Sequence, residues 1–424
     1  MMRNFLISLA ATVALNSAAF AETIVIHAGR LIIDASVAAS GPSTITVIDG
    51  KITAITSGLS AVDPGIRLID LSTKTVLPGL IDSHVHLSGD PGGDYRSEAV
   101  DPDEWGVVVG AKNARITALA GFTTVRDLGS APLVGFALRD GTAKGLIPGP
   151  RILSSGPAIS IIGGHGDVSG FRPEVNAALD GNNTCTGPVQ CAARAREAAK
   201  RGADIIKITA TGGVLSQQGR GLGQHFTDEE MSAIVATAHG LGLKVAAHAH
   251  GARGIEGAAK AGVDSIEHGT FADAAGLKIM KANGSYMVPT LMAFTGIRER
   301  LGKNIYTPTV EAKVRETLKS VGVALKAARE LGVLIAFGTD AGVFEHGRNA
   351  QEFAHMVDLG GLTPAQAIAS ATTGAAKLLG LETMIGRIAV GYSADIIAVS
   401  RDPVTDVRAL EKVDFVMVRG RVIE

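Results

Sequence analysis

Gly79-Leu80-Ile81-Asp82-Ser83-His84-Val85-His86-Leu87 is a short apolar run that ends in two histidines one residue apart. Residues i and i+2 of a strand share a face, so this pair would point in one direction and could bind one metal ion. Taken alone, such a pair is more often two polar residues on the solvent side of a strand. The interpretation as a metal site depends on four later apolar runs that also close on a polar residue, namely Lys207, His248, His268 and Asp340.

The region from about Pro78 to Ile385 repeats one unit, in which a helical stretch and a glycine-containing turn precede a strand. Eight strands are expected, at Ile81, Thr123–Arg126, Arg151–Ser154, Ile205–Ile208 and Lys244–His248, and within Gly257–Gly269, Leu277–Leu291 and Leu318–Gly342. Eight strands that alternate with helices predict an α/β fold, the (β/α)8 TIM barrel, whose chemistry lies at the carboxyl ends of the strands. An open doubly wound sheet is the alternative, and it would need a phosphate-binding glycine loop that we do not find.

Both ends of the chain are rich in short alternating strands. Asp49-Gly50 between two apolar runs indicates a hairpin, and similar strands follow at Asp395–Val399 and Phe415–Val422. Neither end has enough strands to bury a face alone, so we expect them to meet in one small β-sandwich. The predicted organisation is a signal segment (1–21), the two sandwich parts (22–77 and 386–424) and the barrel between them (78–385).

Composition favours a small-molecule partner. The 424 residues carry a formal net charge of -1 without a block of basic residues, which argues against nucleic-acid or membrane-surface partners. The 53 glycines and 46% hydrophobic residues suit an α/β protein with many tight turns and argue against disorder.

The first 21 residues have the pattern of a secretory signal, with Arg3 before an apolar core and Ala19-Phe20-Ala21 as the cleavage site. A transmembrane anchor is the alternative, but the apolar run is shorter than the roughly 20 residues that a span needs. We therefore expect a periplasmic or secreted protein with no membrane partner after removal of the signal. The only two cysteines, Cys185 and Cys191, would form a local disulfide rather than a metal site, because no other thiol is present.

A barrel would bring the six polar residues to one mouth, although they lie up to 256 positions apart. Neutral imidazoles and a carboxylate suit Zn²⁺ and similar ions, and there are enough of them for two metals. A cationic Lys207 beside two divalent ions is unfavourable unless its amine is modified, for instance by CO₂ to a carbamate that bridges the metals.

The motifs around these residues resemble the amidohydrolase superfamily in its two-metal form: Gly79–His86, Lys207, His248, Ser265-Ile266-Glu267-His268-Gly269 and Gly338-Thr339-Asp340-Ala341-Gly342. The resemblance continues to Tyr392-Ser393-Ala394-Asp395 and covers nearly the whole mature chain. Further motifs resemble the Xaa-Pro-dipeptidase-like branch, which includes bacterial carboxypeptidase-type dipeptidases and ochratoxin-degrading amidohydrolases: Gly163-Gly164-His165-Gly166, Thr211-Gly212-Gly213-Val214, His248-Ala249-His250-Gly251 and the cysteine loop.

The resemblance implies a role for each ligand. His84 and His86 would bind the buried metal and His248 and His268 the more exposed one. Carboxylated Lys207 would bridge the two ions. Asp340 would contact the first metal and act as the catalytic acid and base. Relatives of this kind often form homo-oligomers.

Other residues are candidates for substrate contact. His165 and His250 could hold the substrate carbonyl or carboxylate, or could only orient ligands. Arg220 and His225 could pair with a substrate carboxylate, whereas Phe226 stands where many relatives have tyrosine. The remaining polar candidates are expected to be structural or exposed: His27, Asp82, Asp127, His239, Glu267, His346 and His355.

We therefore expect an exported binuclear metallohydrolase that cleaves the amide bond to a C-terminal amino acid, in a dipeptide, an N-acyl amino acid or ochratoxin A. A cyclic-amide hydrolase of the imidazolonepropionase or dihydroorotase kind is an alternative that shares the metal residues. A catalytically silent binding module is a further alternative, which predicts lost ligands, and none is lost.

Overall fold

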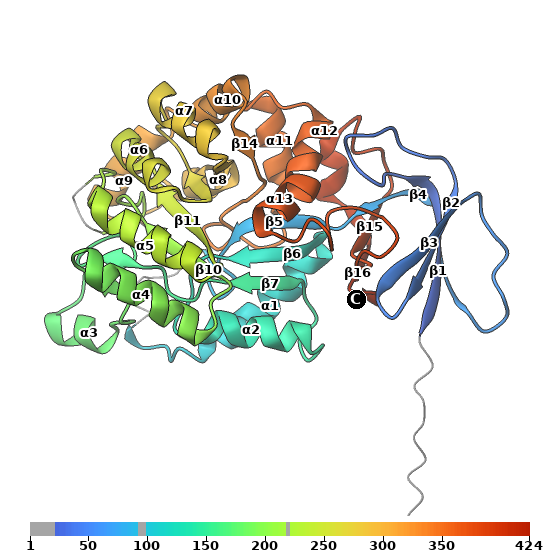
Figure 1. Cartoon of the computed structure of the whole chain (residues 1–424), viewed down its shortest axis with the longest axis horizontal. Helices are drawn as coiled ribbons and strands as arrows, with labels where there is room; N and C mark the ends of the chain where they lie inside the picture. Colours follow the sequence, from blue (N-terminus) through green and yellow to red (C-terminus); the bar gives the residue numbers. More distant parts are fainter. Residues whose placement is uncertain (1–21, 92–98, 218–220) are drawn as a thin grey trace, which may run out of the picture.

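A barrel of short parallel strands forms the larger part of the molecule (Figure 1). The structure is a computed structural model that describes residues 22–91, 99–217 and 221–424. Eight strands of this part surround the barrel axis, in chain order β5 (Leu80–Val85), β6 (Phe122–Asp127), β7 (Arg151–Ser154), β10 (Ile205–Thr209), β11 (Lys244–Ala249), β12 (Ser265–His268), β13 (Tyr286–Val288) and β14 (Leu334–Ile335).

Two hydrogen-bonded ladders make up the barrel, β5-β6-β7 and β10-β11-β12-β13-β14. Bridges close the gaps between them, since Val85 pairs with Ala341 on one side and Ile159 with Ile208 on the other. The barrel predicted from the repeated strand-helix unit is thus confirmed, and the carboxyl ends of its strands share one mouth.

Helices cover the outside of the barrel (Figure 1). Thr227 and Thr363 begin α5 and α12 with capping boxes, in which the hydroxyl and a side chain three residues on satisfy free N–H groups. The helices are α1 (Trp105–Leu119), α2 (Val134–Ala143), α3 (Pro173–Ala178), α4 (Pro188–Arg201), α5 (Asp228–Gly240), α6 (Ala252–Ala261), α7 (Ala274–Asn283), α8 (Leu291–Arg300), α9 (Pro308–Thr317), α10 (Val323–Leu331), α11 (Gln351–Asp358), α12 (Pro364–Ala369) and α13 (Ala375–Leu379). A π-helical turn (Ser370–Gly374) joins α12 to α13, and a 3₁₀ turn spans Val407–Glu411.

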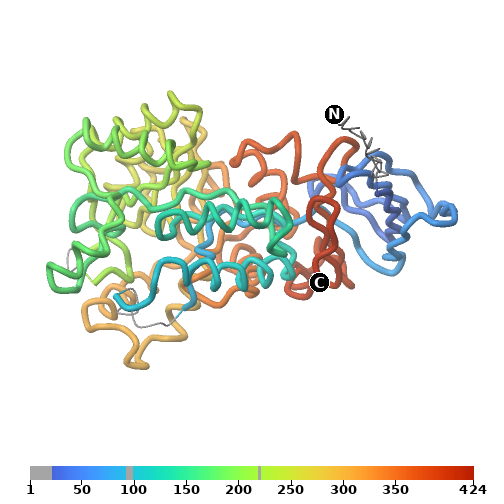
Figure 2. The backbone as a smooth tube through the Cα atoms, turned by 90° about the horizontal axis from the view of Figure 1, so that it is seen from below, coloured from blue at the N-terminus to red at the C-terminus, as the bar shows by residue number. Residues whose placement is uncertain are grey.

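Strands from both chain ends meet in one seven-stranded sheet, in the order β17-β16-β15-β4-β1-β2-β3. Figure 2 shows the C-terminal segment between the barrel and the N-terminal strands. The ends meet as predicted, while the strand pairing by itself does not divide this sheet into the two layers of a sandwich. Its members are β1 (Thr23–Leu31), β2 (Ser43–Ile48), β3 (Lys51–Ser57), β4 (Arg67–Pro78), β15 (Ile396–Val399), β16 (Val413–Val418) and β17 (Arg421–Val422).

A short pair of strands, β8 (Ser160–Ile161) and β9 (Thr184–Cys185), lies between β7 and α4. Cys185 and Cys191 are joined in a disulfide, as the sequence predicted, and this bond ties β9 to the first turn of α4. The predicted signal segment lies outside the described residues. Within the described residues, no helix is both long enough and apolar enough to cross a membrane.

Candidate active site

The carboxyl ends of the barrel strands surround a cavity of about 360 Å³. All six residues predicted to bind metal line it, and so do two of the three histidines considered for substrate contact, His165 and His250. Its ionisable lining consists of His84, His86, His165, Lys207, His248, His250, His268 and Asp340.

His84, His86 and Asp340 form the first cluster, which we call the Asp340 cluster. The Nε2 atoms of His84 and His86 lie 3.4 and 3.3 Å from Asp340 Oδ1. His84 donates its Nδ1–H to Glu267 (2.8 Å), and His86 donates its Nδ1–H to the Gly129 carbonyl (3.0 Å). Because both rings use Nδ1 as a donor, Nε2 is the atom of each ring that faces Asp340 and the cavity and that could bind a metal.

A buried ion pair supports His84 from behind. Glu267 accepts from Arg126 Nη2 at 2.8 Å, and both side chains are at most 1% exposed. Burial acts to raise the pKa of Glu267, but Arg126 and His84 outweigh it and lower that pKa to about 2. Glu267 is therefore ionised at neutral pH, and its charge fixes the orientation and the tautomer of His84.

The backbone of Asp340 adopts a left-handed conformation that positions its side chain. Its φ is +64°, and its N–H donates to the His84 carbonyl at 2.7 Å. The preceding Thr339 donates its hydroxyl to buried Asp82 at 2.6 Å, and Asp82 also accepts from the His84 N–H at 3.1 Å. Asp82 thus joins β5 to the Asp340 segment, which confirms the structural role expected for it.

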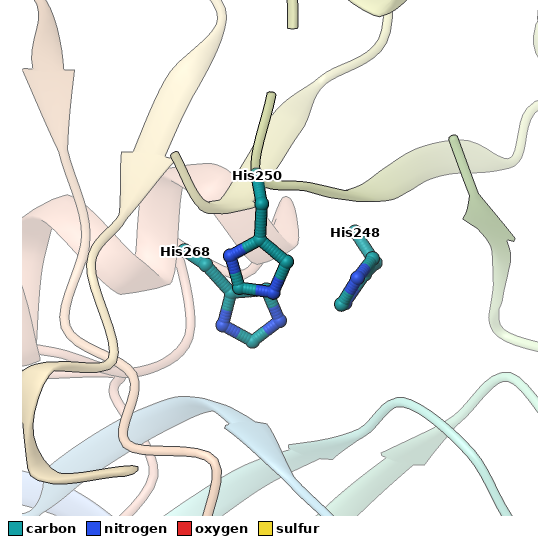
Figure 3. Close-up of side chains that lie close together, drawn as sticks. All are labelled: His248, His250 and His268. Carbon is teal, nitrogen blue, oxygen red and sulfur yellow. The ribbon is translucent and has the colours of Figure 1, made fainter. Parts of the chain in front are cut away.

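His248, His250 and His268 form the second cluster, the triple-histidine group (Figure 3). The rings of His250 and His268 stack at 4.8 Å between centroids, and His248 lies edge-on to both. The ligand atoms of the three residues lie within 4.8 Å of one another, and the same holds for His84, His268 and Asp340. The structure therefore places His250 beside the predicted ligands as well as beside the substrate cavity.

Neutral groups support the triple-histidine group. His268 Nδ1 lies 2.7 Å from the Thr290 hydroxyl, and His250 Nδ1 lies 2.8 Å from the Thr270 hydroxyl. Thr290 has a φ of +48° and His268 one of +69°, which is rare for residues other than glycine. Such strain is typical of functional sites, where the surrounding structure holds it in place.

Lys207 lies 4% exposed on β10, with its Nζ 3.5 Å from His84 Nε2. Burial lowers the pKa of its amine to about 8, although Glu267 and Asp340 act in the opposite direction. A fraction of this amine is therefore neutral near physiological pH, as reaction with CO₂ requires.

His165 reaches the cavity from the loop after β8, and its ring lies tilted against that of His248, with 4.2 Å between the ring centroids. Its Nδ1 lies 2.6 Å from the Ser216 hydroxyl. The other candidates are placed differently. His225 and Phe226 do not line the cavity as far as the described residues define it, Phe226 being 1% exposed in the core. Arg220 lies outside the described residues.

The donor set fits divalent metal ions. Burial lowers the pKa of His250 to about 3, and burial together with the Lys207 charge lowers that of His84 to about 4, so both imidazoles are neutral. The pKa values of His248 and His268 also fall well below the ordinary value because of burial and neighbouring histidines. Burial acts to raise the pKa of Asp340, but His84 and His86 lower it overall, so its carboxylate is ionised. Neutral imidazoles beside a carboxylate are the ligands that Zn²⁺ and similar ions prefer.

A model of the amidohydrolase family matches residues 75–423. The chain belongs to the amidohydrolase family. An ochratoxinase from Aspergillus niger is 33% identical over 357 residues, which cover 80% of this chain and 72% of that protein. The crystal structure of a Xaa-Pro dipeptidase with methionine bound in its active site has a TM-score of 0.86 at 39% identity, over 95% of this chain and 100% of that one. The crystal structure of the A. niger ochratoxinase has a TM-score of 0.82 at 28% identity, over 95% and 96% of the two chains.

These matches confirm the branch that the motifs resembled, and this amidohydrolase is a metal-dependent hydrolase. The residues that support the cavity histidines were not identified from the sequence, namely Arg126, Ser216, Thr270 and Thr290. An arginine inside a predicted barrel strand was the available signal for the first, because a buried guanidinium needs a carboxylate. Hydroxyl side chains are too common in loops to stand out. His346, which was expected to be structural or exposed, is buried and lies 3.2 Å from the His86 carbonyl and 3.1 Å from the Thr117 hydroxyl.

Proposed function

We propose that this amidohydrolase cleaves the amide bond between an acyl group and a C-terminal amino acid, in a dipeptide, an N-acyl amino acid or ochratoxin A. The observation that carries the proposal is the convergence of both histidine clusters, Lys207 and Asp340 on one cavity. The relatives support the substrate class, because one is an ochratoxinase and another a Xaa-Pro dipeptidase that holds methionine in its active site. Methionine is a free amino acid, the kind of product that such a cleavage releases.

His84, His86 and Asp340 would hold one divalent ion, and His248 and His268 a second, both of the zinc type. Lys207 would bridge the ions after its neutral amine nitrogen bonds to the carbon of CO₂ and releases a proton. When bound, the ions supply an activated water and polarise the scissile carbonyl.

The side chains around the cavity move the protons and hold the substrate. Asp340 is ionised, so its carboxylate takes a proton from the attacking water and returns it to the leaving amine nitrogen. The hydroxyls of Ser216 and Thr270 would donate to the Nδ1 atoms of His165 and His250, so that the Nε2–H group of each neutral ring would donate to the substrate carbonyl or carboxylate.

Export to the periplasm or the medium is part of the proposal. The apolar segment before Ala19-Phe20-Ala21 supports it, and so does the disulfide between Cys185 and Cys191, because disulfides persist in oxidising compartments.

The experiment is a substrate panel with the purified metal-loaded enzyme. Dipeptides ending in proline, lysine or phenylalanine, N-acyl amino acids and ochratoxin A form one arm, and cyclic amides such as dihydroorotate form the other. We expect release of free amino acid in the first arm alone. Turnover confined to the cyclic amides would reject the proposal in favour of a cyclic-amide hydrolase.

A further inference from the structure

Six apolar side chains line part of the cavity, and we call them the apolar wall. It comes from three segments that carry no predicted ligand: the loop after β10, the first two turns of α8 and the residues after Asp340. Its members are Val214, Leu215, Ala293, Phe294, Ile297 and Val343. Among the described residues that line the cavity, Lys207 is the only lysine or arginine and Asp340 the only acidic residue.

Four of the wall residues, Val214, Leu215, Ile297 and Val343, belong to or pack against a separate hydrophobic cluster. Val214 and Ile297 pack with Val310 and Val314 of α9, and all four are at most 5% exposed. The helix behind the cavity therefore holds the wall in place, so that it does not collapse into the space beside the ligands.

A buried lysine anchors the loop part of this wall. Lys313 on α9 is 7% exposed, and its Nζ donates to the carbonyls of Gly213 (2.8 Å) and Ser216 (2.6 Å). These two carbonyls flank Val214 and Leu215, the loop residues that face the cavity. The Ser216 hydroxyl also lies 2.6 Å from His165 Nδ1, so the same anchor orients a predicted substrate contact.

We propose that the wall formed by Val214, Leu215, Phe294 and Ile297 is a subsite for an apolar side chain of the substrate, and that Lys313 is the residue that positions it. This inference rests on the proposed amide cleavage and names the substrate class within it. An apolar side chain against the wall loses contact with water, whereas a carboxylate there finds no cationic partner among the described wall residues. Burial of a leucine-sized group corresponds to about a 10- to 100-fold gain in binding.

The test compares substrates of equal shape and different polarity. Leu-Phe, Asn-Phe and Asp-Phe, together with Phe-Leu, Phe-Asn and Phe-Asp, place the same three shapes on either side of the scissile bond. We expect kcat/KM for leucine to exceed that for aspartate at least 30-fold at one of the two positions. We expect Ile297→Asn to reduce that ratio at least fivefold. Ratios below three at both positions, with amide cleavage intact, would overturn the subsite and leave the proposed function standing.

The role of Lys313 has its own readout. Lys313→Met should raise KM for the leucine substrates about 10-fold, with kcat changed less than threefold and metal content unchanged. Lys313→Arg, which keeps a donor, should recover part of the loss. Lys319→Met is the matched control, because Lys319 is exposed just beyond α9. Equal KM values for the Met variants at positions 313 and 319 would overturn the positioning role.

A binding measurement tests the subsite even when no substrate is cleaved. Titration calorimetry of the metal-loaded enzyme with free leucine and free aspartate should give at least 10-fold tighter binding of leucine. If no amide were cleaved, the proposed function would fail while tighter leucine binding still supported the subsite. Equal binding of the two amino acids would overturn the subsite.

Discussion

The two halves of the site are held in different ways. In the Asp340 cluster, a buried ion pair between Glu267 and Arg126 supports His84. In the triple-histidine group, the hydroxyls of Thr270 and Thr290 take the corresponding place. Charge-assisted hydrogen bonds are roughly twice as strong as neutral ones. The half around Asp340 should therefore be rigid, and changes to its supporting residues should cost more stability. The triple-histidine half is held more weakly and should exchange its metal more easily.

Asp340→Asn should have the largest effect on activity, because Asp340 belongs to the Asp340 cluster of candidate metal ligands and also transfers the proton. We expect kcat to fall about 10³-fold, within the range for loss of a general acid-base group. Steady-state kinetics on the best amide substrate measures it, with circular dichroism as the check on folding. A loss below 10-fold would remove Asp340 from the mechanism.

Glu267→Gln should be the most destabilising change behind the ligands. It leaves the Arg126 guanidinium buried without its carboxylate, which costs about 3 to 5 kcal/mol. Urea unfolding of the metal-free protein measures this cost without a contribution from bound metal. A cost below 1 kcal/mol would mean that the two halves are supported about equally, contrary to the comparison.

Glu352 extends the comparison, because it is a carboxylate that binds the start of α8, directly after Thr290. It is fully buried on α11 and accepts from the N–H groups of Leu291 (2.9 Å) and Met292 (2.6 Å) at the start of α8. Burial raises its pKa from 4.5 to about 8, so it is neutral at pH 7. The support on this side of the site is therefore uncharged.

The pH dependence follows from the sign of that shift. Because the pKa of Glu352 is raised in the folded state, its neutral carboxyl stabilises the fold fully below pH 4.5. This contribution is lost as the pH rises towards about 8. Relative to Glu352→Gln, the free energy of unfolding of the native protein should fall across this window by at most about 1.4 kcal/mol per pH unit. Chemical unfolding at a series of pH values tests it, and parallel profiles for the two proteins would show that Glu352 is ionised in the fold.

Thr290→Val should have a smaller effect of another kind. It removes the hydroxyl beside His268 Nδ1 and keeps the branched shape, so it should cost about 1 kcal/mol of stability. Metal affinity should fall about 10-fold at one of the two sites, as is usual for partners of ligating histidines. Competition with a chromogenic chelator would resolve it, and two sites weakened equally would argue against separate halves.

Arg30→Ala should have the smallest effect on stability and activity, and it serves as the control variant. Arg30 pairs with Asp402 at 3.0 Å on the surface, with side chains 46% and 24% exposed. Exposed pairs contribute about 0 to 1 kcal/mol, so thermal unfolding and kinetics should scarcely change. A large loss of activity in this variant would show that the kinetic assay reports general instability.

The sequence was sufficient to predict the barrel and the gathering of the candidate ligands at one cavity, because both depend on local patterns. Each strand is a short apolar run, and His84, His248, His268 and Asp340 stand at the ends of such runs. Glu267 was expected to be structural or exposed, and it is fully buried between His84 and Arg126.

The supporting residues could not be predicted in the same way. Thr290, Lys313 and Glu352 act through hydrogen bonds to segments between 22 and 100 residues away, and no local periodicity marks them. The apolar wall was missed for a related reason. Phe294 and Ile297 have the ordinary spacing of a core-facing helix, and only the tertiary structure shows that they face the cavity.

The central claim is that this mouth binds two metal ions and uses them to cleave amides. The most direct measurement is metal content by mass spectrometry together with amide hydrolysis, on the native protein and on Lys207→Ala, before and after chelation and reloading with Zn²⁺. We predict close to two equivalents of metal in the native protein, activity that disappears on chelation and returns on reloading, and fewer than two equivalents without turnover in the variant. Amide hydrolysis that survives complete removal of metal would contradict the account.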